Sequence, residues 1–506
     1  MHSTQRRSKF YTDFPLCSDR ASDLGIPVKL TIPSILRVAF CGVLFFAVAA
    51  CEQSADDSLS RRQLQLVQEE NARLVALVAR IDPDNARTTA LENGKSTDQN
   101  VAVLSAANER LRGIYRSDEQ RRSAEKNLVV RTGIERAVEE IRGLKFKKPV
   151  QYEVLDRKDI RAALRKRMDA VFSPEEFEEY ARAQARIGLL PEKFALREKL
   201  IALLGEQVAA FYDQHEHRLY MYSDATLENS MNRVILSHEL MHAMQDQHFT
   251  LSKLPLTEKH NDDSAVAASA LIEGEATLLM GDYAVQNPSA GMVLENLGAM
   301  FMQNTAELAT APRYLSETLI FPYQQGIKFA SYGMDSGGWE AISRAFANPP
   351  RSTSQILHPE KYWGVREDPL RVEWADLKFE GKPAQVDNVV GELGVRILFT
   401  NWHDAAVAAK ASEGWRGDRY LSFASGDCLV WKTIWASNAD AIEFFAAEEA
   451  LLRQRYKAQS PVSVERRWES NRPRALRLVR NDRAEVLLVD APDSAKALAL
   501  EEQFGR

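Results

Sequence analysis

Apolar positions divide the chain into an N-terminal part with helical stripes and a longer part with mixed periodicity. In the N-terminal part, two series of residues recur at alternating steps of three and four, the spacing of one helix face. Both series place an asparagine within the apolar stripe. We expect two helices here, either short coiled-coil segments or a helical hairpin, forming a stalk over residues 51–144. The series are Leu64, Val67, Asn71, Leu74, Val78, Ile81 and Val101, Leu104, Asn108, Leu111, Tyr115.

The role of this stalk has two open interpretations. It can hold the rest of the chain away from a surface or pair two chains into a homodimer. Alternatively, the helices pack on their own domain or serve as a flexible spacer. Each stretch spans about three heptads or fewer, which is marginal for association by itself.

From residue 145 onward the pattern predicts a globular α+β fold that is mainly helical, with regions 145–368 and 369–506. Ser173, Pro174 and Glu176 form a helix start, with a serine cap, a proline in the first turn and a glutamate at the third position. The two glycines of 414–420 favour a turn over a cleft-lining segment. Expected strands are 149–155, 420–424, 428–436, 475–479 and 484–489, and expected helices are 194–205, 227–247, 264–285, 291–346, 389–402 and 439–456.

Residues 208–222 predict a β-hairpin, because two runs rich in β-formers flank a polar centre. His215 and His217 are expected in its exposed turn. With 506 residues and 45% apolar residues, the chain can bury a large core. Its net charge is only −6, and its basic residues are scattered among acidic ones. Nothing in this distribution favours binding to nucleic acid.

Residues 38–50 form an apolar run of 13 residues, too short to span a bilayer but suitable as the core of a signal peptide. The run ends in Val48-Ala49-Ala50-Cys51, which resembles a bacterial lipobox. That resemblance implies a signal peptide over residues 1–50, lipidation of Cys51 and a membrane-anchored protein of the cell envelope. Glu52 resembles a sorting signal for the outer membrane, on its periplasmic side. The alternative is a cytoplasmic protein with a short buried apolar segment.

The strongest chemical signal is His238-Glu239-Leu240-Met241-His242. Positions i and i+4 share a helix face, so both imidazoles can bind one metal ion, with Glu239 as general base for a bound water. With nine histidines in the chain, chance produces this pattern roughly 0.01 times. The flanking residues are uncharged, which favours a buried helix over a solvated one. The motif predicts a Zn²⁺-dependent hydrolase.

A third protein ligand is expected, because catalytic zinc sites usually have three. Glu273 is the best candidate, since the segment around it is otherwise apolar and a carboxylate there needs a partner. Gly274 beside it indicates close approach of another helix. Glu275 is the alternative ligand.

These residues resemble the gluzincin zinc peptidases, in which His-Glu-x-x-His is followed on a second helix by a glutamate ligand, often in Glu-Gly-x-Ala. Here that sequence is Glu273-Gly274-Glu275-Ala276. The resemblance implies a zincin-like catalytic domain, with metal ligands His238, His242 and Glu273 and with Glu239 as the catalytic base. Thermolysin-like members carry an aspartate four residues after the ligand glutamate to orient a histidine, whereas this chain has Thr277.

The same resemblance implies that the strand before the motif helix, Leu219 to Tyr222, is a sheet edge that binds extended peptide. An ordinary half-buried hairpin is the alternative. A tetrahedral intermediate also needs an electrophile, and the candidates are Tyr323 and His358, the latter in a proline-bounded loop.

The leading expectation is therefore a lipid-anchored zinc metallopeptidase acting on peptide or protein substrates. Two alternatives stay open. One is a non-catalytic envelope scaffold or interaction protein that retains a peptidase-like fold. The other is a different zinc hydrolase, such as an amidase acting on cell-wall peptides.

Overall fold

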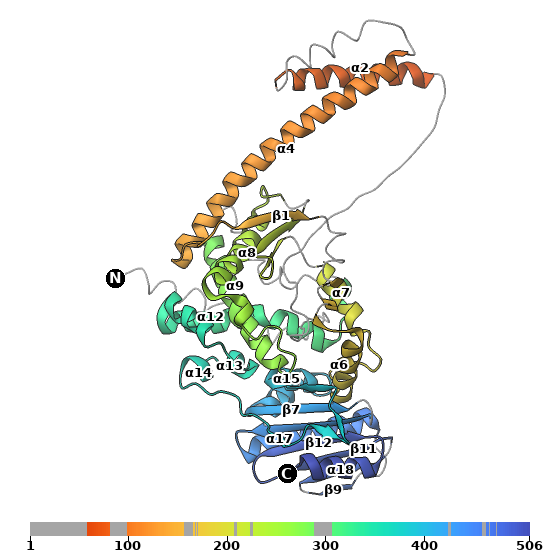
Figure 1. Ribbon diagram of the computed structural model, residues 1–506, viewed down its shortest axis with the longest axis vertical. Helices are drawn as coiled ribbons and strands as arrows, with labels where there is room; N and C mark the ends of the chain where they lie inside the picture. The colour runs from red at the N-terminus through yellow and green to blue at the C-terminus, as the bar shows by residue number, and fades with distance from the viewer. Residues whose placement is uncertain are drawn as a thin grey trace. The chain divides into compact units, whose positions relative to one another are not determined.

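The chain folds into two compact units, one within residues 45–136 and the other from residue 137 onward (Figure 1). The second unit combines helices with separate β-sheets, so the expected α+β class, mainly helical, is confirmed. The computed structural model describes residues 58–80, 99–155, 165–166, 168–169, 171–206, 210–222, 226–287, 306–423, 427–457, 462–464, 466–471 and 473–505.

The N-terminal unit contains α2 (Ser58–Val78) and most of α4 (Gln99–Arg142). Leu74 and Val78 of α2 form an apolar cluster with Leu111 of α4. Within the same interface, Asn71 Nδ2 donates a hydrogen bond of 2.7 Å to Asn108 Oδ1, and both side chains are buried. The two expected helices are confirmed, and within one chain their stripes pack against each other. The asparagine pair fixes their register, because sliding one helix would leave a buried amide without its partner.

Three long helices form the centre of the second unit: α8 (Ser230–Phe249), α9 (Asp262–Gln286) and α12 (Arg313–Ala347). They confirm the helices expected at 227–247 and 264–285 and much of the one at 291–346, of which residues 291–305 lie outside the described part. The close approach expected at Gly274 is also confirmed. A Cβ added to Gly274 would lie 2.1 Å from the carbonyl oxygen of Gly326 in α12. The two helices therefore cross with their main chains in contact.

Replacing Gly274 with alanine should destabilise the second unit, because the new methyl group meets a backbone carbonyl that no rotamer change can move. The expected cost reaches the upper part of the 1–3 kcal/mol typical of overpacking, about 3 kcal/mol. Urea unfolding followed by circular dichroism measures it. The matched control is Gly133→Ala in α4, where an added Cβ meets nothing within 4 Å. That change should be neutral or stabilise by roughly 0.5–1 kcal/mol. Equal urea midpoints for Gly274→Ala and the wild type would contradict the prediction.

A three-stranded sheet lies beside α8 and comprises β1 (Gln151–Leu155), β2 (Ala210–Asp213) and β3 (Arg218–Tyr222). The predicted strand at 149–155 and the predicted hairpin are confirmed, and His215 and His217 are exposed in its turn. The strand order is β1-β3-β2. The expectation that Leu219 to Tyr222 form a sheet edge is therefore wrong, since β3 pairs with β2 on one side and with β1 on the other. The edge strand that contacts α8 is β2.

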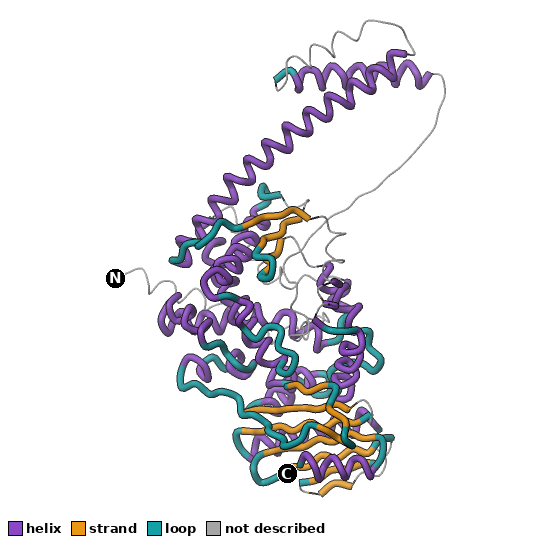
Figure 2. The backbone as a smooth tube through the Cα atoms, in the orientation of Figure 1, coloured by secondary structure: helices purple, strands orange, loops and turns teal. Residues whose placement is uncertain are grey.

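The C-terminal part is a seven-stranded antiparallel sheet of order β6-β7-β8-β12-β11-β10-β9 (Figure 2). Helix α18 (Ser494–Phe504) covers one face, where Leu500 and Phe504 pack with Val430. Phe444 of α17 (Asn438–Tyr456) packs on the neighbouring residue Trp431, and hence on the other face. The strands are β6 (Val386–Asn388), β7 (Trp415–Phe423), β8 (Cys428–Trp435), β9 (Val462–Val464), β10 (Arg467–Ser470), β11 (Ala475–Arg480) and β12 (Glu485–Ala491).

One expectation in this region is wrong. Residues 414–420 do not form a turn, because only Gly414 has a left-handed φ of +78° and strand β7 begins at Trp415. The second glycine, Gly417, lies at a β-bulge, where the carbonyl of Leu370 would be 2.1 Å from an added Cβ. Its role is close backbone approach within a strand.

Shorter elements complete the unit. Helix α6 begins at the predicted capping box, in which Ser173 and Glu176 exchange side-chain-to-backbone hydrogen bonds. No helix among the described residues is long and apolar enough to cross a bilayer. Residues 38–50 and Cys51, on which the anchor prediction depends, lie outside the described residues. The remaining elements are α6 (Pro174–Ile187), α7 (Leu196–Glu206), a 3₁₀ turn (Leu251–Lys253), α11 (Ala306–Ala309), α13 (Thr353–Leu357), α14 (Glu360–Trp363), α15 (Gly391–Thr400), α16 (Ala405–Ser412), β4 (Lys378–Phe379) and β5 (Lys382–Pro383).

Candidate metal centre

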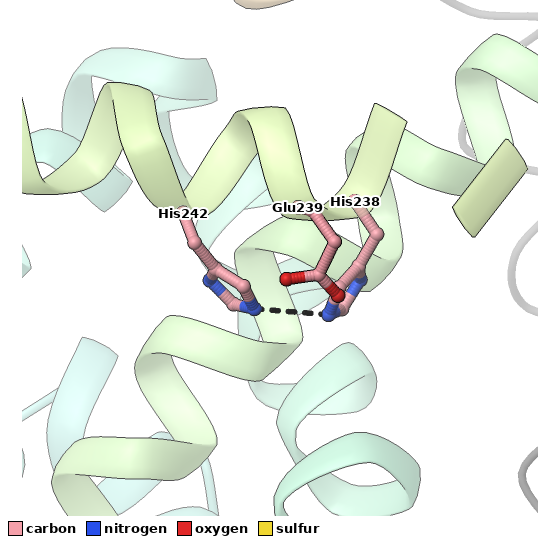
Figure 3. A group of neighbouring side chains, drawn as sticks. All are labelled: His238, Glu239 and His242. Carbon is pink, nitrogen blue, oxygen red and sulfur yellow. Dashed lines mark hydrogen bonds between the residues drawn. The ribbon is translucent and has the colours of Figure 1, made fainter. Parts of the chain in front are cut away.

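His238, Glu239 and His242 extend from the same side of α8 (Figure 3). The helix begins after Asn229, whose side chain accepts a hydrogen bond from the Met231 amide, and it ends at Thr250 with a left-handed φ of +58°. Every residue from 234 to 246 is buried. The motif is therefore part of a core helix, and its polar side chains need partners inside the protein.

The partner comes from α9. The two imidazoles face each other, with 3.0 Å between His238 Nε2 and His242 Nε2. Glu273 Oε2 lies 3.1 Å from His238 Nε2 and 3.4 Å from His242 Nε2. Three potential ligand atoms from two helices thus converge on one point, as expected for His238, His242 and Glu273.

These separations are hydrogen-bond distances, and they are also compatible with shared binding of a zinc ion. Two atoms that each lie 2.0–2.1 Å from a tetrahedral zinc ion are about 3.3 Å apart. The three measured separations, 3.0, 3.1 and 3.4 Å, lie close to that value. Glu239 adds a second carboxylate near this point, since it forms with His238 and His242 a buried group whose potential ligand atoms lie within 4.8 Å of one another. The donor set of two imidazoles and a carboxylate suits zinc.

The charges in the cluster favour a cation at the same point. Burial opposes ionisation of Glu273, but the imidazoles of His242 and His238 outweigh it and hold the pKa of that carboxyl well below its ordinary range. Burial would lower the pKa of His242, yet the Glu273 and Glu239 carboxylates raise it to about 9. Burial and the neighbouring His242 lower the pKa of His238. The site therefore holds an ionised carboxylate whose charge must be balanced by a proton or a metal ion.

A series of buried hydrogen bonds begins at His242 Nδ1, the ring nitrogen that does not face His238. His242 Nδ1 lies 2.9 Å from Gln245 Oε1, and Gln245 Nε2 donates to Glu275 Oε2 at 2.8 Å. Glu275 in turn accepts a bond of 2.7 Å from Arg142 Nε. Both ionic side chains are almost fully buried, at 2% and 0% exposure. Such support of a metal-binding imidazole sets its tautomer and orientation.

These hydrogen bonds show what Glu275 contacts. The alternative ligand of the sequence analysis pairs with Arg142 and Gln245, and it belongs to the supporting hydrogen bonds of His242. Gln245 bonds to His242 Nδ1 from the same helix, whereas the buried hydroxyl of Thr277 makes no hydrogen bond among the described residues. Gln245 and Arg142 were not predicted. Gln245 could have been found, since it lies three residues after His242 on the same face, whereas no local signal connects Arg142 to Glu275.

Glu239 is held by the sheet edge. Its Oε2 accepts a hydrogen bond of 2.9 Å from the backbone amide of Tyr212 in β2. That amide consequently points away from β3 and towards the motif. The carboxylate of Glu239 is thereby oriented beside the two imidazoles, where a general base for a water molecule is required.

The two candidate electrophiles differ in position. Tyr323 in α12 lies beside the cluster, with its ring centroid 6.1 Å from that of His238. His358 follows α13, and its Nε2 is 2.6 Å from Glu392 Oε1. The contacts of His358 connect it to Glu392 and Glu360 and not to the motif histidines. The structure therefore brings Tyr323, but not His358, to the candidate metal ligands.

The comparisons with known proteins concern the C-terminal sheet. Residues 380–501 match a family model described as a domain of unknown function, DUF8575. This segment includes strands β6 to β12 and does not include α8, α9 or α12. No curated protein and no solved structure matches the chain.

Proposed function

We propose that the chain is a zinc-dependent hydrolase of peptide bonds, with a zincin-like catalytic domain built on α8, α9, α12 and the three-stranded sheet. One observation carries this proposal: the convergence of His238 Nε2, His242 Nε2 and Glu273 Oε2 beside the carboxylate of Glu239. His238, His242 and Glu273 would hold a zinc ion, which would supply Lewis acidity to a scissile carbonyl and make a water molecule easier to deprotonate.

Glu239 is the general base of the proposed reaction. Its carboxylate accepts a proton from the attacking water and delivers it to the nitrogen of the leaving amine. The Tyr212 amide restrains this carboxylate on Oε2, so that it need not reorganise before the proton moves. His242 is restrained in the same sense by Gln245.

The substrate is proposed to be an extended peptide lying along β2. This strand is at the edge of its sheet, and an added strand pairs with an edge through main-chain hydrogen bonds. Because the Tyr212 amide is already bonded to Glu239, the pairing would use the other outward-facing main-chain groups of the strand. The corrected strand order therefore moves the expected binding edge from Leu219–Tyr222 to Ala210–Asp213.

Tyr323 is proposed as the electrophile that stabilises the tetrahedral intermediate, because its ring lies against His238. Replacing Tyr323 with phenylalanine should lower kcat by roughly 10²–10³-fold, the usual cost of losing one oxyanion donor. KM and zinc content should change little, since the ring stays in place. Steady-state kinetics on a fluorogenic peptide measure the effect. His358→Phe is the matched control, and an equal loss in both variants would exclude Tyr323 from this role.

The proposed setting is the bacterial cell envelope, with Cys51 as the lipid anchor and the N-terminal helices, which pack on each other within one chain, as a stalk. Metal analysis of the purified protein, beside digestion of a peptide library, tests the activity. Bound zinc with cleaved peptides supports the peptidase. Without bound zinc or cleavage, the chain is better described as a non-catalytic envelope scaffold. Bound zinc with cleavage restricted to cell-wall peptides would instead indicate an amidase.

A further inference from the structure

Tyr212 connects two separate points of the motif helix to the sheet edge. Its amide donates to Glu239 Oε2 at 2.9 Å, and its phenol donates to Asp246 Oδ2 at 2.8 Å. Glu239 and Asp246 are seven residues apart on α8, so they share a face and are about 10 Å apart along the axis. One residue of β2 is therefore held at both ends by the same helix.

We propose that Asp246 is a positioning residue of the active site, which acts through Tyr212 to hold the carboxylate of Glu239 in place. This inference rests on the proposed function, because it assigns the support of the proposed general base. Among the described residues, Asp246 makes no hydrogen bond to His238, His242 or Glu273. It can therefore act on Glu239 only through Tyr212.

Asp246 is itself firmly held. Its side chain is 2% exposed, and Oδ1 accepts a hydrogen bond of 3.1 Å from the Leu251 amide at the end of α8. On Oδ2 it also meets His217 Nδ1 at 2.7 Å, from the turn between β2 and β3. Because His217 is 71% exposed, this contact is screened by water and contributes little. The phenol of Tyr212 remains a donor throughout the physiological range, since burial and the Asp246 carboxylate raise its pKa.

The position of β2 depends on such contacts. It is a four-residue edge strand with ladder hydrogen bonds on one side only, to β3. On the other side, Tyr212 bonds to α8 through both its amide and its phenol. Another tyrosine of the same hairpin has a different role: the hydroxyl of Tyr220 bonds to Glu216, within the hairpin itself. This pair provides an internal control.

The test compares Tyr212→Phe, Asp246→Ala, Asp246→Asn and the control Tyr220→Phe. Selective ¹⁵N-tyrosine labelling allows hydrogen exchange of the Tyr212 amide to be followed, independently of any activity. In Tyr212→Phe the same amide is followed by ¹⁵N-phenylalanine labelling. Tyr212→Phe and Asp246→Ala should accelerate its exchange by about tenfold or more, because the amide is less firmly held on Glu239. Asp246→Asn keeps an oxygen that accepts the phenol and should restore most protection. Tyr220→Phe should leave the exchange unchanged.

Kinetics supply the second readout. Tyr212→Phe and Asp246→Ala should lower kcat by roughly 10- to 100-fold, the order expected for a small misplacement of a catalytic group, with unchanged zinc content and KM. Unaltered Tyr212 amide exchange in both variants, or equal acceleration in Tyr220→Phe, overturns the inference. If the wild-type protein binds zinc but hydrolyses nothing, the proposed function fails, while the exchange experiment still decides whether Asp246 positions Glu239. Tyr212→Phe removes one oxygen atom only, so the test does not depend on the folding of Asp246→Ala.

Discussion

Replacing Glu273 with alanine should remove most of the zinc from the purified protein. The wild type is expected to hold about one ion per chain, since catalytic sites use three protein ligands. Without Glu273, two imidazoles remain, and the carboxylate that lies within 3.4 Å of both Nε2 atoms is lost. The affinity should fall by more than the roughly 10- to 100-fold caused by losing a supporting hydrogen-bond partner.

Plasma emission spectrometry after dialysis measures the zinc content, and a thermal melt with and without chelator gives an independent signal. Chelation should lower the melting temperature of the wild type and leave that of Glu273→Ala unchanged, because only bound metal adds stability to the native state. The matched control is Glu340→Ala, which removes a carboxylate that is 84% exposed on α12. Full zinc occupancy in Glu273→Ala would refute the ligand assignment.

Replacing Glu239 with glutamine should abolish peptide hydrolysis while zinc remains bound. Glutamine keeps the shape of the side chain and an oxygen that can accept the Tyr212 amide, but it cannot take a proton from water. Loss of a general base typically lowers the rate by about 10²–10⁴-fold. The measurement is kcat on a fluorogenic peptide, read together with zinc content and far-ultraviolet circular dichroism.

The pairing of these two variants separates binding from chemistry. Glu273→Ala should lose the metal and the activity together, whereas Glu239→Gln should lose only the activity. A Glu239→Gln protein that cleaves peptides at the wild-type rate would show that another group takes the proton. A Glu239→Gln protein without zinc would show that Glu239 is itself a ligand, an option that its position within the 4.8 Å cluster makes worth testing.

Local sequence was sufficient for the elements that carry the candidate metal centre. The His-Glu-x-x-His spacing, the isolated carboxylate of Glu273 and the adjacent Gly274 each act over a few residues, and the structure brings all of them together. The N-terminal stripes were likewise readable, because their period of three to four residues is a property of a single helix.

Features that depend on the order of distant segments were not predictable in this way. The edge strand was misplaced because β1 pairs with β3 from 67 residues earlier in the chain, and periodicity says nothing about which strands are neighbours. Arg142 reaches Glu275 across 133 residues, so its role follows only from the fold. His358 had suitable chemistry in a suitable loop, yet the packing of α13 directs it to Glu392.

The main-chain contact between Gly274 and Gly326 limits how this site can be redesigned. Because the two helices touch through their main chains, exchanging neighbouring side chains cannot change the distance between them. The helices that carry Glu273 and Tyr323 are therefore held at a fixed separation. Attempts to alter the proposed substrate selectivity should therefore change the short β2–β3 hairpin and not the helix crossing. The hairpin contacts α8 through a few polar side chains that can be replaced.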